Sequence, residues 1–193
     1  MTEFHRQGAR VVVFDIDATA GHALVSELGT GASYVAVDLT DLDALGVAFA
    51  QAGADYGGFG VRVNNAAHDD RHDMMDVTPA YWRGRMSVNL DHQFFAAQAV
   101  VPAMRRKGTG AIVNMSSIAW SVGLENAPAY VTAKAAIEGL THAQARDLGP
   151  DGIRVNCVLP GFVRTTRQVE KWLTPEFEGD CCVNTWCRPS FGF

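Results

Sequence analysis

One stretch of this chain, residues 110–134, constrains the fold more than any other. It begins with an apolar run, Ala111-Ile112-Val113, whose β-branched content is typical of a buried strand. It ends with Tyr130 and Lys134, followed by residues that favour a helix. Residues four apart lie on one face of a helix, so the Lys134 ammonium can approach the Tyr130 phenol and favour the phenolate. Ser117 follows the strand, where a hydroxyl can reach a substrate oxygen.

Length and composition limit the class of protein. With 193 residues, the chain is long enough for one domain and too short for two of ordinary size. Its 48% hydrophobic and 19% charged residues are typical of a soluble globular protein, and no apolar run is long enough to cross a bilayer. The net charge of -5 argues against a nucleic-acid partner. No secretory signal is visible, so a cytoplasmic location is expected.

The first predicted strand, residues 10–15, ends with an acidic residue. Asp15 at its carboxyl end can accept hydrogen bonds from the ribose hydroxyls of a dinucleotide, and its charge repels the extra phosphate of NADP. We therefore predict that Asp15 selects NAD. Asp17 is a competing choice that is better explained as a helix cap, and Asp15 itself has the alternative reading of a solvated loop acid.

Further elements alternate along the chain. Apolar and polar patterning predicts strands and helices in turn, with Thr78-Pro79 as a cap and first residue of a helix. The predicted strands are 34–39, a run ending at Asn64, 111–113 and 153–158, and the predicted helices are 19–28, one ending near Gln51, 80–106 and one from Tyr130 that stops at Gly149.

The spacing of Ser117, Tyr130 and Lys134 resembles the catalytic signature of the short-chain dehydrogenase/reductase family. The resemblance implies an α/β fold, a Rossmann-like doubly wound parallel sheet in three αβα layers, with a nicotinamide cofactor and hydride transfer. It adds Asn89 as a fourth catalytic residue, which holds a water that connects the lysine to solvent.

The same resemblance implies a cofactor site. Asp38 and Leu39 would contact the adenine, Asn65 and Ala66 would flank the adenosine, Tyr130 and Lys134 would hold the nicotinamide ribose, and the Pro160-Gly161 turn with Val163 and Thr165 would support the nicotinamide. Simpler readings stay open for two of these segments: Asp38 or Thr40 caps the next helix, and Pro160-Gly161 is a generic turn.

Other segments resemble the aldose 1-dehydrogenase branch of the family, of the D-xylose type. They include Asn64-Asn65-Ala66-Ala67, Val88-Asn89-Leu90 and Lys171-Trp172-Leu173. The branch implies NAD-dependent oxidation of an aldose at its anomeric carbon to an aldonolactone. A ketone or 3-oxoacyl reductase of the same family is the alternative enzyme. The partner would be a small molecule, with homo-oligomers expected in intact relatives.

Two polar clusters invite a metal reading, which we do not favour. The segment His68–His72 follows a strand on the cofactor side, and we interpret it as a polar loop lining the sugar end of the pocket. Cys181, Cys182 and Cys187 lack paired C-x-x-C or Cys/His spacing and are read as reduced thiols, with Cys157 as a small residue in a buried strand. No metal is expected.

Both ends of the chain depart from the family pattern. No glycine-rich turn precedes Gly8, so the first strand and its phosphate-binding turn are expected to be missing, and past residue 178 the resemblance stops, before the last strand. We predict a truncated domain over residues 1–178 and a divergent, disordered tail over 179–193. The alternative to an active enzyme is therefore an inactive fragment, or an association partner of intact relatives.

Overall fold

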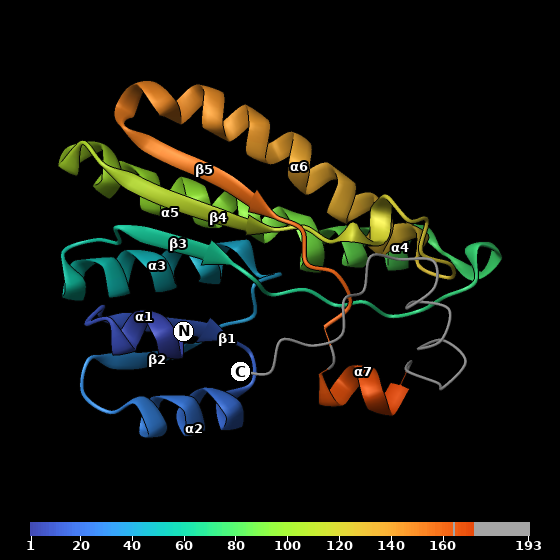
Figure 1. Cartoon of the computed structure of the whole chain (residues 1–193), viewed down its shortest axis with the longest axis horizontal. Helices are drawn as coiled ribbons and strands as arrows, with labels where there is room; N and C mark the ends of the chain where they lie inside the picture. The colour runs from blue at the N-terminus through green and yellow to red at the C-terminus, as the bar shows by residue number, and fades with distance from the viewer. Residues whose placement is uncertain (164, 172–193) are drawn as a thin grey trace.

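The computed structural model describes residues 1–163 and 165–171 and shows parallel strands that alternate with helices (Figure 1). All the strand pairs in this part of the chain are parallel, as in an α/β protein, and each strand is short. The strands are β1 (Val11–Asp15), β2 (Ala32–Ala36), β3 (Val61–Asn64), β4 (Gly110–Met115) and β5 (Ile153–Val158).

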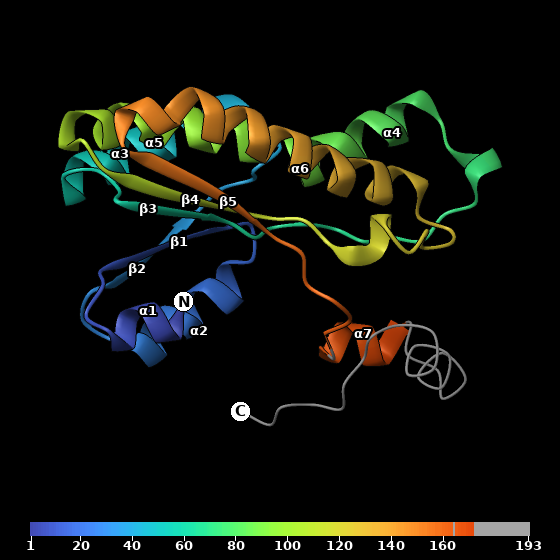
Figure 2. The ribbon, with the colours of Figure 1, turned by 45° about the horizontal axis from the view of Figure 1, so that its top comes forward.

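Helices cover both faces of the strands, so the predicted three-layer arrangement is confirmed (Figure 2). Helices α1 and α2 lie on one face, and α3, α5 and α6 lie together on the other. The helices are α1 (Thr2–Arg6), α2 (Ala18–Leu28), α3 (Leu42–Tyr56), α4 (Pro79–Met86), α5 (His92–Lys107), α6 (Pro128–Leu148) and α7 (Thr166–Lys171). None of the helices in the described ranges is long and apolar enough to cross a membrane.

The strands form two sheets. One contains β1 and β2, with Val11 opposite Ala32, and the other has the order β3-β4-β5, with Val61 opposite Ala111 and Gly110 opposite Ile153. Within the part of the chain that the structure describes, no strand pairing joins β1 to β3. The predicted divergent tail, and any last strand beyond residue 171, lie outside the described residues.

Side-chain caps explain where several helices begin. The Asp17 carboxylate accepts a hydrogen bond from the Ala20 N–H at the start of α2, and Thr78 caps α4 ahead of Pro79, so both predicted caps are confirmed. The alternative reading of Asp38 or Thr40 as the cap of α3 is wrong. Asp41 caps that helix, whereas the Asp38 carboxylate accepts hydrogen bonds from the N–H and hydroxyl of Thr40, at 2.9 and 2.7 Å.

Three predicted boundaries also differ from the structure. The strand predicted over 34–39 ends at Ala36, because the chain turns inward there and buries Val37 and Leu39 in the core. Helix α3 continues past Gln51 to Tyr56, since the left-handed turn that ends it is at Gly57. The long helix predicted over 80–106 is divided by a π-helical segment, Ser87–Asp91.

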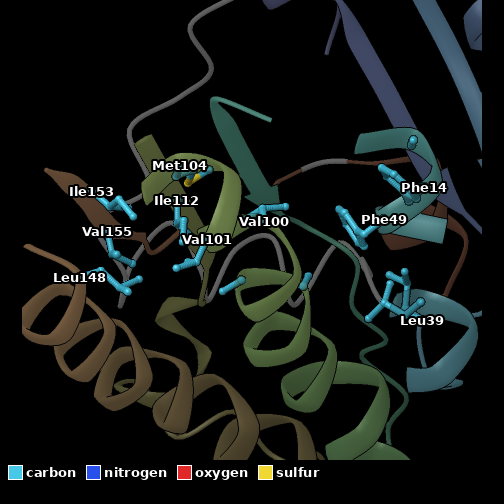
Figure 3. Packing of buried hydrophobic residues seen from close by; sticks show 14 of the residues in the cluster. Phe14, Leu39, Phe49, Val100, Val101, Met104, Ile112, Leu148, Ile153 and Val155 are labelled. Carbon is cyan, nitrogen blue, oxygen red and sulfur yellow. The ribbon is translucent and has the colours of Figure 1, made fainter. Parts of the chain in front are cut away.

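A hydrophobic core lies between the sheets and the α3, α5 and α6 layer (Figure 3). Phe14, Leu39 and Phe49 group at one end of this core, and Ile112 and Val155 lie at the other. The rings of Phe14 and Phe49 stack with their centroids 4.2 Å apart. The core thus spans both sheets, although the backbones of the two sheets are not joined.

A buried polar network fastens the three-stranded sheet to α6. The Asn64 amide donates to the Asn114 side-chain oxygen at 2.8 Å, and the Asn114 amide donates to Thr141 and Gln144 at 3.0 and 3.1 Å. Because each of these buried groups has a partner, the network holds β3, β4 and α6 in one register. This register places the carboxyl ends of β4 and β5 beside the first turns of α6.

Candidate active site

A pocket of about 220 Å³ lies where β4 and β5 end, and three of the four predicted catalytic residues line it: Ser117, Tyr130 and Lys134. Ser117 follows β4 and begins a short 3-10 helix, where its hydroxyl accepts a hydrogen bond from the Ala119 N–H at 3.1 Å. Tyr130 and Lys134 lie one turn apart in the first turns of α6. The structure therefore brings together side chains from two elements separated by a loop.

Lys134 is almost fully buried, with 2% of its surface exposed. Its Nζ donates to the Met115 carbonyl at 2.7 Å, and the same atom lies 5.5 Å from the centroid of the Tyr130 ring. Burial lowers the pKa of Lys134 to about 8, because the charged ammonium is partly removed from water. The ammonium is thus anchored to the end of β4.

The pKa of Tyr130 is raised, chiefly by burial and secondarily by the negative charge of Asp69. A hydrogen bond with Ser117 and the positive charge of Arg71 act in the opposite direction. The expectation that Lys134 would bring the phenol toward its phenolate is therefore not met in this structure, where the cation that favours the phenolate is Arg71. At neutral pH the phenol of Tyr130 is protonated.

Asn89, the fourth predicted catalytic residue, lies outside this pocket in the π-helical segment between α4 and α5. Its side-chain oxygen accepts from the His68 N–H at 2.8 Å, and its amide donates to the carbonyls of His68 and Arg85 at 3.1 and 2.9 Å. The Asn89 side chain therefore holds the loop that follows β3. Its role in holding a catalytic water stays a prediction.

The residues predicted to bind a cofactor divide between two cavities. Asp15, Leu39 and Ala66 line a larger cavity of about 690 Å³, between β1 and β3. Pro160, Gly161, Val163 and Thr165 line the smaller pocket beside Tyr130 and Lys134. Asn65 lines both cavities, so it marks where they meet. Asp38 lines neither of them.

Hydrogen bonds fix the turn between β5 and α7 (Thr166–Lys171). The Thr165 N–H donates to the Val163 carbonyl at 2.9 Å, and the Thr165 hydroxyl accepts from the Gln168 N–H at 3.2 Å. Pro160 accepts a hydrogen bond from the Ile118 N–H, which ties this turn to the segment after Ser117. The predicted nicotinamide-binding turn is thus fixed against the catalytic residues, and Thr165 acts as a helix cap.

The charged and polar side chains of the two cavities suit the two ends of a nicotinamide dinucleotide. The Asp15 carboxylate accepts the Asp17 N–H at 3.0 Å and lines the larger cavity, where an acidic group suits ribose hydroxyls. Lys134 and the hydroxyls of Ser117 and Tyr130 give the smaller pocket donors that suit a ribose and a reacting oxygen.

Further polar residues of the smaller pocket include Asp69 and Arg71, which belong to the loop predicted to line it, and Gln168, which was not predicted. The Gln168 amide donates to the Asp69 carboxylate at 2.7 Å, and Arg71 donates to the Glu125 carbonyl at 3.0 Å. Asp69 and Arg71 belong to the loop interpreted as the sugar end of the pocket. The position of this loop just after β3 predicted its place at the pocket, because neighbouring parallel strands end at the same edge of the sheet.

The remainder of that loop makes structural contacts. His68 lies 3.2 Å from the Asp70 carboxylate, and Arg85 approaches both side chains. His72 faces the start of α6, where it accepts from the Ala129 N–H at 3.4 Å. Over the described ranges, no group of three or more His, Cys, Asp or Glu residues could hold a metal ion. Cys157, predicted as a small residue in a buried strand, is half-buried in β5.

The fold and pocket agree with comparisons to known proteins. The model of a family described as enoyl-(acyl carrier protein) reductase matches residues 2–182. The chain therefore belongs to the short-chain dehydrogenase/reductase family, and it is an oxidoreductase by lineage. This confirms the family that the Ser117, Tyr130 and Lys134 spacing predicted.

Two relatives are particularly similar. One is a D-xylose 1-dehydrogenase of Caulobacter vibrioides, 51% identical over 91% of this chain and 70% of its own length. Another is a probable galactose dehydrogenase of Rhizobium meliloti, 48% identical over 90% of this chain and 69% of its own length.

Solved structures show the same fold. A short-chain dehydrogenase from Streptomyces avermitilis is 30% identical and superposes with a TM-score of 0.78, covering 84% of this chain. The matched region spans 60% of that structure. A second member of the family is 32% identical and superposes with a TM-score of 0.81.

Proposed function

We propose that this chain carries the site of an NAD-dependent sugar dehydrogenase, which oxidises an aldose such as D-xylose at its anomeric carbon to an aldonolactone. The observation that supports it most is the pocket that places Ser117, Tyr130 and Lys134 beside the polar side chains of Asp69 and Arg71. A polyhydroxylated substrate needs several donors and acceptors around the reacting carbon, and this pocket offers both. The names of two similar relatives, a D-xylose and a galactose dehydrogenase, point the same way.

Each catalytic role follows from the position of its group. Ser117 would donate a hydrogen bond to the anomeric oxygen, and Tyr130 would remove the proton from that hydroxyl. Because burial raises the pKa of Tyr130, the proposal needs positive charge beside the phenol during the reaction, and Arg71 and Lys134 would supply it. The cofactor would supply the hydride acceptor. Asp15 would favour NAD over NADP by repelling a 2′-phosphate.

A titration with NADH, followed by nicotinamide fluorescence, tests the cofactor part of this proposal. Saturable binding that weakens in Asp15→Ala, with NADPH binding more weakly than NADH to the unchanged protein, is expected. A folded chain, shown by circular dichroism, that binds neither nucleotide would overturn the enzymatic proposal in favour of an inactive fragment.

The substrate part is tested by NAD reduction with D-xylose, D-galactose and other aldoses. Reduction by an aldose that is lost in Ser117→Ala and Tyr130→Phe is expected. If the chain binds NADH but oxidises no aldose, and instead consumes NADH with a ketone or 3-oxoacyl compound, the sugar assignment is wrong and the reductase alternative stands.

A further inference from the structure

The turn that carries Ser117 is fastened on one side to β5. We call residues 116–120 the Ser117 turn. The N–H of Ser116 donates to the Val158 carbonyl at 2.9 Å, and the N–H of Ile118 donates to the Pro160 carbonyl at 3.1 Å. These backbone bonds on either side of Ser117 fix the turn to the sheet. They do not set its distance from the catalytic tyrosine, because that tyrosine belongs to α6.

Side chains fasten the same turn to α6, beside which it lies in Figure 1. At the end of the turn, the Trp120 indole N–H donates to a carboxylate oxygen of Glu138. At its start, the Ser116 hydroxyl donates to the Lys134 carbonyl at 2.7 Å and lies 3.3 Å from the same oxygen of Glu138. One carboxylate of α6 therefore contacts residues on both sides of Ser117.

The place of Glu138 on α6 gives these contacts a direction. Tyr130, Lys134 and Glu138 follow one another at four-residue spacing, so they share one face of the helix. Ser116 is 3% exposed and Glu138 is half-buried, and a hydrogen bond to a charged group is stronger where water is partly excluded. Glu138 thus holds the Ser117 turn against the face of α6 that carries the tyrosine and the lysine.

The Tyr130 phenol is sensitive to the position of this turn. Burial raises the pKa of Tyr130, and a hydrogen bond with Ser117 lowers it. A hydrogen bond weakens steeply as its distance grows and its angle bends, so a small movement of the turn away from α6 would remove that contribution. The readiness of the phenol to lose its proton therefore depends on what holds the turn in place.

We propose that Glu138 is a positioning residue, which holds the Ser117 turn against α6 and so keeps the Ser117 hydroxyl within hydrogen-bond reach of the Tyr130 phenol. Glu138 is not among the described residues that line the smaller pocket, so it acts on the site through Ser117. Its value for catalysis rests on the proposed function, in which Tyr130 removes a proton from the substrate. The hydrogen-bond geometry does not depend on that function.

The pKa of Tyr130 tests this proposal on the full chain without any turnover. Tyrosines labelled with carbon-13 at Cζ give an NMR signal that moves when the phenol ionises, and the signal lost in Tyr130→Phe identifies this residue among the 4 tyrosines of the chain. Lys134, whose pKa is about 8, is neutral where tyrosines titrate, whereas Asp69 and Arg71, which face the phenol from the loop after β3, stay charged. Circular dichroism over the same pH range shows that each variant is folded.

We expect the pKa of Tyr130 to rise by about 0.5 to 1 in Ser117→Ala, the value of one hydrogen bond. Glu138→Ala should also raise it, and Glu138→Gln should restore most of the original value, because the amide oxygen can still accept from Trp120. Both replacements remove the charge, so the difference between them isolates the hydrogen bonds. Asp147→Ala, at an exposed position of the same helix, is the matched control and should leave the pKa unchanged.

Double variants show whether Glu138 acts through the Ser117 turn. Ser117→Ala combined with Glu138→Ala should raise the pKa of Tyr130 no further than Ser117→Ala alone, since residues that act through one contact are not additive. Trp120→Phe keeps an aromatic ring and removes the indole N–H. It should raise the pKa as Glu138→Ala does, and the two changes together should add little to either one.

Three outcomes would overturn the proposal. An unchanged pKa of Tyr130 in Ser117→Ala would mean that the serine does not act on the phenol. Equal values in Glu138→Ala and Glu138→Gln would mean that the hydrogen bonds of Glu138 do not hold the turn. Additive rises in the double variant would show that Glu138 acts by a route other than Ser117. The sugar dehydrogenase proposal fails separately, when no aldose reduces NAD, because these titrations need neither substrate nor cofactor.

Discussion

The two sheets of this protein differ in the buried polar contacts that hold them and in the predicted site residues that they carry. The three-stranded sheet is tied to α6 by the buried network of Asn64, Asn114, Thr141 and Gln144, and it carries Ser117 and the turn at Pro160. Both sheets have an edge strand, β1 or β3, on the larger cavity that lies between them. The difference separates two tasks: the groups that would perform chemistry belong to the first sheet, whereas Asp15, predicted to choose the cofactor, belongs to the second.

The largest expected effect concerns the chemistry of the three-stranded half. Tyr130→Phe should reduce sugar-dependent NAD reduction by about 10²–10⁴-fold, because the ring remains but the proton acceptor is lost. NADH binding should change far less than the rate. Tyr56→Phe, which removes a hydroxyl that donates to Ser33 in the β1-β2 half, is the matched control and should keep its rate. Equal losses in both variants would show that the two halves do not divide the work in this way.

A second expected effect is a loss of stability at low pH. It tests how well water is excluded where α5 meets the end of β3. His92 is fully buried, its Nε2 lies 3.1 Å from the Ala66 carbonyl, and burial, assisted by the charge of Arg62, lowers its pKa to about 4. The unfolded chain binds this proton near its ordinary pKa of 6.5, so stability falls as pH drops from about 6.5 to about 4.

The loss from His92 should approach about 3 kcal/mol at the acid end. Urea unfolding of the unchanged protein and of His92→Gln, at several pH values, measures it as the pH dependence of the difference between the two. If that difference is the same at pH 7 and at pH 4.5, water reaches His92 and is not excluded from the contact between α5 and the end of β3.

A third effect concerns Lys134, whose pKa burial lowers to about 8. The lysine is charged below that pH and loses its charge above it. If the ammonium holds the cofactor, NADH affinity should fall about tenfold as pH rises through 8, the value of one charge-assisted hydrogen bond. In Lys134→Arg the guanidinium stays charged, and the fall should disappear even if affinity is lower throughout. A fall that persists in the arginine variant would exclude Lys134 as its cause.

The smallest expected effect comes from one substitution, valine to alanine, made in each half of the molecule to compare their packing. Val13 in β1 and Val155 in β5 have nearly equal exposure, 8% and 7%, but Val13 lines the larger cavity between β1 and β3. Val155→Ala should cost about 2 kcal/mol and Val13→Ala about 1 kcal/mol, since a side chain beside a void has fewer contacts to lose. Urea midpoints of the two variants measure the difference. Equal costs would mean that the cavity between β1 and β3 is closed in solution.

Much of the fold and of the candidate pocket could be predicted because it depends on local patterns. The β5 bounds, the caps at Asp17 and Thr78 and the family all followed from short segments, since a strand run, a cap or a catalytic spacing is complete within a few residues. The prediction failed where one contact excludes another, either within a loop or in the core. The cap of α3 is Asp41 because Asp38 binds Thr40, and β2 ends early because Val37 and Leu39 are buried in the core.

The sequence alone determined which chemical groups this protein has and roughly which elements carry them: a serine after one strand, a tyrosine and a lysine one helical turn apart, and an acid after another strand. Only the tertiary structure decided what those groups meet. It directs the Lys134 ammonium to the Met115 carbonyl and joins Asp69 to Gln168 across 99 positions of the chain. Burial and long-range contact set these outcomes, because the charge and hydrogen bonds of a group depend on neighbours that the chain brings together only when it folds.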